Sequence, residues 1–312
     1  MNVKYTTIII AVLIVLGFVS GCDPKMEIPS YIWIDSIDFH VADEATQGTA
    51  SHKITDVWVT ANGKGLGLYQ IPTRIPILES GPTRLTIDAG IMLGGVSITR
   101  SPYPFYTSYS LPSINLKKGQ IDTLIPSFTY TNLTRFKTEC MEDFESAGIK
   151  FKTHGTSAPL KKTNDVNLIF HYPKEKNNYS GIIELPYKND SATVHHFEIR
   201  TVTPVELTYL DMKDCLMELN FCITHNVEIG MIIHSASSTI PDRQQEVARL
   251  TGYDTISNEK NVWKKVYVNF TTEIKDASKY QMKNFDIYIR ATTPSNEKAR
   301  FLFDNIKLLY QN

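Results

Sequence analysis

The 312-residue sequence predicts an all-β protein of two β-sandwich domains, the second of jelly-roll type, behind a short apolar leader. Short runs rich in β-branched and aromatic residues recur along the chain, separated by Asn, Gly and Pro. Helical spacing of apolar residues is scarce, and only residues 243–250 suggest two helical turns. The apolar fraction of 42% and the charged fraction of 21% indicate a globular protein.

The chain begins with features of a secretory leader. Lys4 supplies a positive charge, and an uninterrupted apolar run extends from Ile8 to Leu16. This run is too short for a membrane span of about 20 residues, but it suits the apolar region of a signal peptide. Small residues, Val19-Ser20-Gly21, directly precede Cys22. We therefore expect residues 1–21 to be a signal peptide.

The Val-Ser-Gly-Cys motif after this leader resembles the lipobox of bacterial lipoproteins, in which the cysteine receives fatty acyl chains such as palmitate. The resemblance implies that Cys22 is the lipidation site, that residues 22–30 are a lipidated tether, and that the anchor lies in the cell envelope, at the outer membrane. Two or three acyl chains hold a protein durably, since each buried CH₂ contributes about 0.8 kcal/mol. An ordinary signal peptide or an uncleaved anchor is the alternative, and the membrane leaflet stays open.

Residues 31–130 are expected to form the first sandwich. Asn62-Gly63 lies between two strand-like runs and predicts a tight hairpin, because both turn positions tolerate positive φ. The stretch 55–90, with its Ile-Pro-Thr-Arg-Ile-Pro connection, resembles a PEGA-type repeat, which implies a small Ig-like sandwich that acts as a spacer near the membrane. The Pro-Tyr loop at 101–109 favours packing on the sandwich edge over binding a sugar face.

Residues 138–312 are expected to form the second sandwich, because about eight strand-like runs follow one another at short spacing. These runs are 166–171, 181–185, 194–199, 215–221, 227–233, 263–270, 285–290 and 300–309. The opening Asp143-Phe144-Glu145, the Trp263 strand and the closing run 303–308 resemble galactose-binding-like jelly rolls found among carbohydrate-binding modules.

That resemblance implies two kinds of site. Glu145 and Asp304 match the positions at which these jelly rolls often hold a structural calcium ion, although calcium needs six to eight oxygen ligands. The alternative is that both carboxylates are solvated or paired with lysine. Trp263, Tyr253 and Tyr179 are candidates for stacking on a sugar, and the alternative for each is ordinary packing.

The remaining cysteines are predicted to be buried apolar residues. Cys215 and Cys222 lie seven residues apart in one strand-like run, so they point to opposite faces and do not pair with each other. A disulfide of either with Cys140 stays open. No Cys-x-x-Cys pair occurs, which argues against a structural zinc site.

The net charge and the motifs of the sequence exclude several classes of function. The net charge of −1 argues against a nucleic-acid partner. Motifs for zinc proteases, α/β-hydrolases, P-loops and dinucleotide binding are absent from the sequence, so we expect no enzyme and no required cofactor. Four Asp-Ser/Thr-apolar triplets resemble O-glycosylation sites of exported Bacteroidota proteins.

We therefore expect a cell-envelope lipoprotein that acts as a non-catalytic binding module for a glycan or another surface ligand. The alternative is a structural or assembly lipoprotein, such as a fimbrial, secretion or motility accessory protein, whose partners are envelope proteins. A hydrolase whose site the sequence does not reveal is a third reading.

Overall fold

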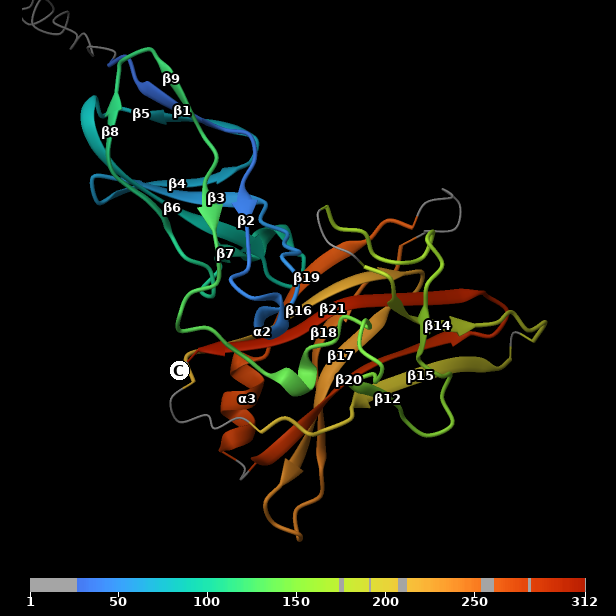
Figure 1. Ribbon diagram of the computed structural model, residues 1–312. Coiled ribbons are helices and arrows are strands. Elements are labelled where there is room, and N and C mark those ends of the chain that lie inside the picture. Colours follow the sequence, from blue (N-terminus) through green and yellow to red (C-terminus); the bar gives the residue numbers. More distant parts are fainter. Residues whose placement is uncertain are drawn as a thin grey trace, which may run out of the picture.

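The computed structural model describes residues 27–173, 177–190, 192–206, 212–253, 261–279 and 282–311 and shows an all-β protein (Figure 1). The predicted fold class is confirmed. The predicted leader and Cys22 lie outside the described residues. Within those residues, no helix is both long enough and apolar enough to cross a membrane.

The first sandwich contains ten strands and two short helical turns in its described residues. They are β1 (Ser30–Ile34), β2 (Asp38–Phe39), α2 (Glu44–Gln47), β3 (Asp56–Ala61), β4 (Lys64–Gln70), β5 (Thr73–Ile77), β6 (Gly81–Met92), η1 (Ser97–Thr99), β7 (Arg100–Pro102), β8 (Tyr109–Leu116), β9 (Ile121–Leu124) and β10 (Ser127–Phe128). The strand orders are β4-β3-β6-β7, with β8 also paired to β6, then β5-β1-β9 and β10-β2.

The residue pattern of the first sandwich explains its strands. Leu85, Ile87 and Ala89 of β6 are buried and alternate with more exposed residues, as a half-buried strand requires. The predicted hairpin is confirmed, since Asn62 has φ 48° and Gly63 has φ 80° between β3 and β4. The rings in the loop 101–109 are buried at Tyr103, Phe105 and Tyr106, which confirms the packing interpretation of this loop.

The second sandwich contains two larger sheets. Its elements are β11 (Arg135–Phe136), η2 (Thr138–Cys140), β12 (Phe151–Thr153), β13 (Lys161–Thr163), β14 (Ser180–Leu185), β15 (Val194–Thr201), β16 (Asp214–Ile223), β17 (Val227–Ser235), β18 (Arg243–Leu250), β19 (Lys264–Asn269), α3 (Thr271–Ser278), β20 (Met282–Pro294) and β21 (Ala299–Gln311). One sheet has the order β13-β14-β21-β16-β19, with β11 paired to β21, and the other has the order β12-β15-β20-β17-β18.

Two local predictions are wrong. Residues 243–250, expected to be helical, form β18, because they pair along the edge of β17 from Ile233↔Arg243 to Val227↔Leu250. Residues 166–171, expected to be a strand, form a turn in which the Asp165 carboxylate accepts the Asn167 N–H at 2.9 Å. The domain limits 31–130 and 138–312 stay a prediction.

All three described cysteines are free and buried. Cys140 and Cys215 lie in the core between the sheets of the second sandwich, whereas Cys222 belongs to a small cluster with Ile182 and Leu302. Cys215 and Cys222 therefore occupy opposite faces of β16, as predicted, and the alternative disulfide with Cys140 is not formed. Burial raises the pKa of the Cys140 and Cys215 thiols, so both stay protonated.

The first sandwich packs on the outer face of β16, β19 and β21, as Figure 1 shows. Leu216, Tyr267 and Leu309 come from these strands but belong to the hydrophobic core of the first sandwich. Leu93 also forms a bridge with Tyr267, and the Gly94 N–H donates to the Tyr267 carbonyl at 2.8 Å. The two sandwiches thus share one apolar interface.

A charged cluster lies within this interface. We call it the Glu218 cluster: Glu218, Lys265, Lys307, Tyr103 and Tyr130. The Glu218 side chain is 0% exposed, and its Oε2 lies 2.7 Å from Nζ of Lys265. The hydroxyls of Tyr103 and Tyr130 donate to Glu218 Oε1 at 2.8 and 3.1 Å. Burial raises the pKa of both tyrosines, so these hydroxyls keep their protons.

Both lysines of the Glu218 cluster also bind the first sandwich. Lys265 Nζ donates to the Ser51 carbonyl at 2.7 Å, and Lys307 Nζ donates to the Thr49 carbonyl at 2.5 Å. Burial by itself raises the pKa of Glu218, but the charges of Lys265 and Lys307 outweigh it and place this pKa below its ordinary value. Glu218 is therefore a buried carboxylate whose partners come from both sandwiches.

His52 is a neutral residue beside this cluster. Its ring lies 5.6 Å from the ring of Phe39 and 6.1 Å from that of Tyr172. Burial, reinforced by the charge of Lys265, lowers the pKa of His52 from 6.5 to about 4, although Glu218 acts in the opposite direction. Protonated His52 is therefore disfavoured in the folded protein.

This shift predicts a pH-dependent stability. As the pH falls below 6.5, the unfolded chain binds a proton that folded His52 does not bind until about pH 4. The contribution of neutral His52 to the free energy of unfolding is therefore complete above pH 6.5. It falls as the pH drops toward 4, by up to about 3 kcal/mol. Urea unfolding across this range should show a shallower pH dependence for His52→Gln than for wild type. The exposed control Gln120→Asn, which removes no titratable group, should keep the wild-type slope. Equal slopes for all three chains would contradict this assignment.

Candidate ligand-binding site

The outer face of the sheet β12-β15-β20-β17-β18 carries a row of charged side chains. Glu198 of β15 pairs in register with Arg290 of β20, Arg290 pairs with Glu228 of β17, and Glu228 pairs with Arg249 of β18. We call these four residues the charged ladder. Opposite charges on directly paired strand positions stabilise a sheet by about 0.2–1 kcal/mol per pair.

Glu228 contacts both arginines of the ladder, although Arg249 lies closer to Glu246 of its own strand, at 2.8 Å. The Oε1 atom of Glu228 lies 2.5 Å from Nη2 of Arg290, and its Oε2 lies 3.5 Å from Nη2 of Arg249. Arg290 Nη1 lies farther from Glu198, at 3.9 Å. The side chains are 14% exposed at Glu228, 35% at Arg290 and 59% at Arg249. The carboxylate is thus recessed between two more accessible guanidinium groups.

Tyr288 forms the floor beneath Arg290. The guanidinium lies 4.8 Å from the centre of the Tyr288 ring, and the tyrosine hydroxyl donates to Glu228 at 2.5 Å. Burial and this hydrogen bond raise the pKa of Tyr288 to about 12. Gly230 makes room for the ring, since a Cβ at this position would lie 2.4 Å from Tyr288 Cζ. These contacts fix Glu228 and Arg290 before any ligand arrives.

A hollow of about 250 Å³ lies beside the ladder. It is lined by Asn226, Val227, Glu228, Arg249, Arg290, Ala291 and Thr292. Two guanidinium groups supply donors, one carboxylate supplies an acceptor, and a threonine hydroxyl supplies either. This set can form hydrogen bonds to a polar, hydroxyl-bearing ligand.

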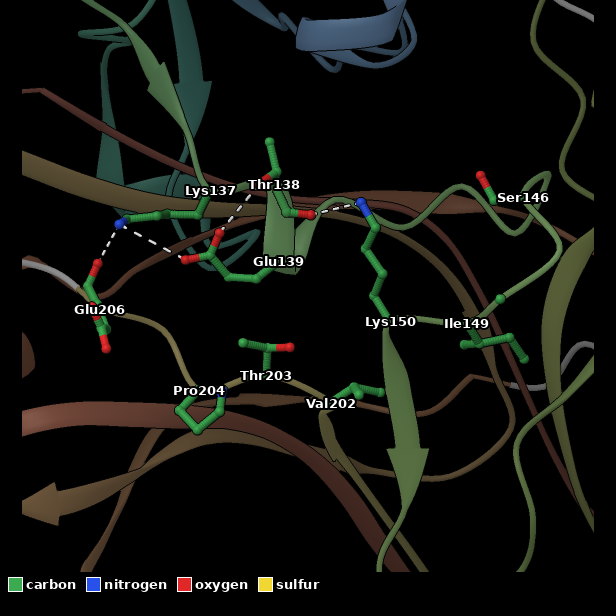
Figure 2. A pocket seen from close by; sticks show the side chains of 11 residues that line it. Lys137, Thr138, Glu139, Ser146, Ile149, Lys150, Val202, Thr203, Pro204 and Glu206 are labelled. Atoms are coloured by element: carbon green, nitrogen blue, oxygen red, sulfur yellow. Dashed lines mark hydrogen bonds and ion pairs between the residues drawn. The ribbon is translucent and has the colours of Figure 1, made fainter.

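A larger hollow, about 780 Å³, lies elsewhere, between residues 137–150 and 202–206 (Figure 2). Figure 2 shows that the ammonium groups of Lys137 and Lys150 point at protein acceptors. Lys137 donates to the Glu206 carbonyl and lies 3.8 Å from the Glu139 carboxylate, while Lys150 donates to the Thr138 carbonyl at 2.7 Å. No aromatic residue lines this groove.

The cations of both hollows are paired with protein acceptors, since Arg290 lies against Glu228 and Arg249 against Glu246. The ladder is the stronger candidate because its Arg249 is 59% exposed, whereas Lys137 is 18% exposed.

The structure brings the two predicted calcium ligands to one segment. Glu145 accepts the backbone N–H groups of Asn178 and Tyr179 at 2.8 and 2.9 Å. Asp304 accepts the hydroxyl of Ser180, and burial raises the pKa of this carboxyl well above its usual range. Residues 178–180 therefore connect both side chains.

These contacts do not favour a metal ion. The oxygens of Glu145 and Asp304 already accept N–H and O–H donors, and the burial that raises the pKa of Asp304 disfavours the charged carboxylate that calcium prefers. Over the described ranges, no group of three His, Cys, Asp or Glu side chains is placed to hold a metal. The two residues as arranged do not fit a calcium site, and calcium stays a prediction of the sequence resemblance alone.

The three aromatic candidates lie away from the ladder. Trp263 packs with Phe170, ring centres 5.3 Å apart, on the cluster that contains Cys222. The Tyr253 hydroxyl donates to the Phe221 and Val262 carbonyls at 3.2 and 2.5 Å. Tyr179 directly precedes β14. All three flank or contact strands of the other sheet, so the structure does not place them on the charged face.

One hydroxyl–histidine–carboxylate chain occurs near the loop after β16. Thr224 Oγ1 lies 2.9 Å from His225 Nδ1, and His225 Nε2 lies 2.7 Å from Glu297. However, the Thr224 hydroxyl also accepts the Arg300 N–H at 2.9 Å and lies 3.3 Å from the Arg300 carbonyl. A hydroxyl that is tied to backbone in this way is not arranged as a free nucleophile.

No protein-family model matches the sequence, and no curated protein matches it. The similar solved structures include carbohydrate-binding modules. The CBM22-1–GH10 modules of xylanase 10B from Clostridium thermocellum show 11% identity over 54% of this chain and 27% of that chain, with a TM-score of 0.34. The family 11 module of Lic26A-Cel5E from Clostridium thermocellum shows 15% identity over 55% of this chain and 93% of that chain, with a TM-score of 0.33.

A third structure, described as a carbohydrate-binding module from the β-sandwich superfamily, shows 12% identity over 91% of this chain and 99% of that chain, with a TM-score of 0.38. This is a distant structural similarity to carbohydrate-binding-module β-sandwiches. The chain spans about a quarter of the xylanase structure and nearly all of the other two.

Sequence reasoning missed the charged ladder. Each strand shows the signal by itself, for example Glu198 and Arg200 alternating with buried residues in β15. What the sequence does not contain is the register that sets Glu198, Arg290, Glu228 and Arg249 in one row.

Proposed function

We propose that this chain is a cell-envelope lipoprotein whose second sandwich is a non-catalytic binding module for a glycan. The charged ladder is the observation that carries the proposal. The first sandwich occupies the outer face of β16, β19 and β21, which leaves the ladder face as the accessible sheet surface of the second sandwich.

The ladder suits sugar hydroxyls, because each hydroxyl both donates and accepts a hydrogen bond. Arg249 and Arg290 would donate to hydroxyl oxygens, and Glu228 would accept from the neighbouring hydroxyl. Tyr288 already fixes the positions of Glu228 and Arg290, so binding orders few side chains. We expect recognition mainly by hydrogen bonds, since Trp263, Tyr253 and Tyr179 do not lie on this face.

The anchor of the proposed lipoprotein is Cys22. The leader, the small residues before the cysteine and the lipobox resemblance support acylation there and a location at the outer membrane. Partners would then be the membrane, through the acyl chains, and a glycan at the distal sandwich.

The alternative function is a structural or assembly lipoprotein that binds an envelope protein. Strand β4 favours it, because it ends its sheet order in the described structure and pairs there with β3. Its sequence, Lys-Gly-Leu-Gly-Leu-Tyr-Gln, has one charge and no proline, so little prevents another strand from adding to this edge.

A glycan array followed by titration calorimetry on residues 23–312 tests the binding module. We expect binding by wild type and a loss of at least about tenfold in affinity for Arg249→Ala, since one lost charged hydrogen bond is worth about 1.5 kcal/mol or more. Arg249 is well exposed, so the variant should remain folded. Arg84→Ala, an exposed arginine of the first sandwich, is the matched control. No binding at millimolar glycan, or equal affinities for all three chains, contradicts the proposal.

Cys22→Ser tests the anchor separately. Wild type should incorporate labelled palmitate and enter the detergent phase on extraction. The variant should lose the label and retain its leader, because the acylated thiol is missing. If Cys22→Ser is processed and membrane-bound like wild type, the lipoprotein assignment is wrong.

A further inference from the structure

Three large aliphatic side chains are exposed at the amino-terminal end of the first sandwich. Ile28 is 61% exposed, Leu78 is 60% exposed and Ile121 is 52% exposed. We call them the amino-terminal rim. Aliphatic side chains exposed to this degree gain free energy by leaving water.

Strand pairing brings the rim together. Ser30 at the start of β1 pairs with Ile77, which places Leu78 next to the chain that enters β1. On the other side of β1, Tyr31 pairs with Ile121. The Gly119 N–H donates to the Pro29 carbonyl at 2.9 Å, so the turn before β9 also lies beside residues 28–29. Segments from three parts of the sequence therefore meet at one edge.

Charges around the rim nearly cancel. The turn before β9 exposes Lys117 and Lys118, while Glu27 and Glu79 are exposed on the neighbouring segments. Arg74 lies over the Tyr31 ring at 4.8 Å. The rim is an apolar surface surrounded by both positive and negative side chains. It therefore does not require a partner of a particular charge.

The chain itself limits what can cover the rim. Ile28 lies six residues after Cys22. The distance between these two residues is therefore at most about 20 Å, the length of a fully extended chain of six residues. If Cys22 carries acyl chains in the bilayer, the rim stays within that distance of the lipid surface. The amino-terminal end of the first sandwich also lies away from the second sandwich in Figure 1.

We propose that the amino-terminal rim rests on the bilayer, with Ile28, Leu78 and Ile121 inserted at the boundary between headgroups and acyl chains. This inference rests on the proposed lipidation of Cys22. The rim adds a second attachment to the acyl anchor and thereby sets the orientation of the first sandwich on the membrane. Because the rim is nearly neutral, contact should form on zwitterionic lipid and should resist added salt.

Lipid quenching of a fluorescent label tests the rim in the lipidated full-length protein, reconstituted in phosphatidylcholine vesicles that contain brominated lipid. The label is placed on Leu78→Cys or Ile121→Cys. The other described cysteines are buried and should not react. The control is Ile98→Cys, which is 90% exposed and lies near Leu93, at the end of the first sandwich that contacts Tyr267.

Labels at positions 78 and 121 should be quenched at least about threefold more than the label at 98, because only the rim enters the lipid boundary. Equal quenching at the rim and control positions, with the protein still bound to vesicles, contradicts the insertion of the rim but not the lipidation of Cys22. A chain that does not bind vesicles and carries no acyl group overturns the anchor, and the rim proposal with it.

Discussion

The ion pair between Glu218 and Lys265 is the constraint on which the arrangement of the two sandwiches depends. Both side chains are almost completely buried, and removing such ions from water costs several kcal/mol each. Partners from both sandwiches offset that cost: Lys265 and Lys307 from the second, and Tyr103 and Tyr130 from the first. Separating the sandwiches would remove donors from a buried carboxylate, so the cluster opposes any sliding of one sandwich on the other.

The interface between the two sandwiches determines which of their surfaces remain accessible to a ligand or a membrane. The outer face of β16, β19 and β21 is used for the interface, and the ladder around Glu228 lies on the other sheet. The rim lies beside the start of β1, and β1 lies at the end of the first sandwich away from the second (Figure 1). A membrane contact at the rim and a ligand contact at Glu228 would therefore have a constant relation in space, which a flexible linker between the sandwiches would not provide.

The sequence predicts the local structure better than the contacts between distant segments. The Asn62-Gly63 hairpin and the opposite faces of Cys215 and Cys222 follow from backbone geometry alone. Residues 243–250 look helical in isolation and become a strand because β17 offers an edge to pair with. Lys265, an ordinary alternating charge in the sequence, is 2% exposed in the structure and donates to the Ser51 carbonyl of the first sandwich. The charged ladder likewise cannot be predicted from the sequence, since it depends on the register across four strands.

Differential scanning calorimetry of residues 23–312 tests the central claim, that the Glu218 cluster joins the sandwiches into one cooperative unit. We expect one transition with equal calorimetric and van't Hoff enthalpies, and a loss of about 3–5 kcal/mol for Glu218→Ala, because the buried lysines lose their counter-ion. Asp276→Asn, which removes an exposed ion pair, should behave as wild type. Two separate transitions in the wild-type protein, or an unchanged melting temperature for Glu218→Ala, would contradict the account.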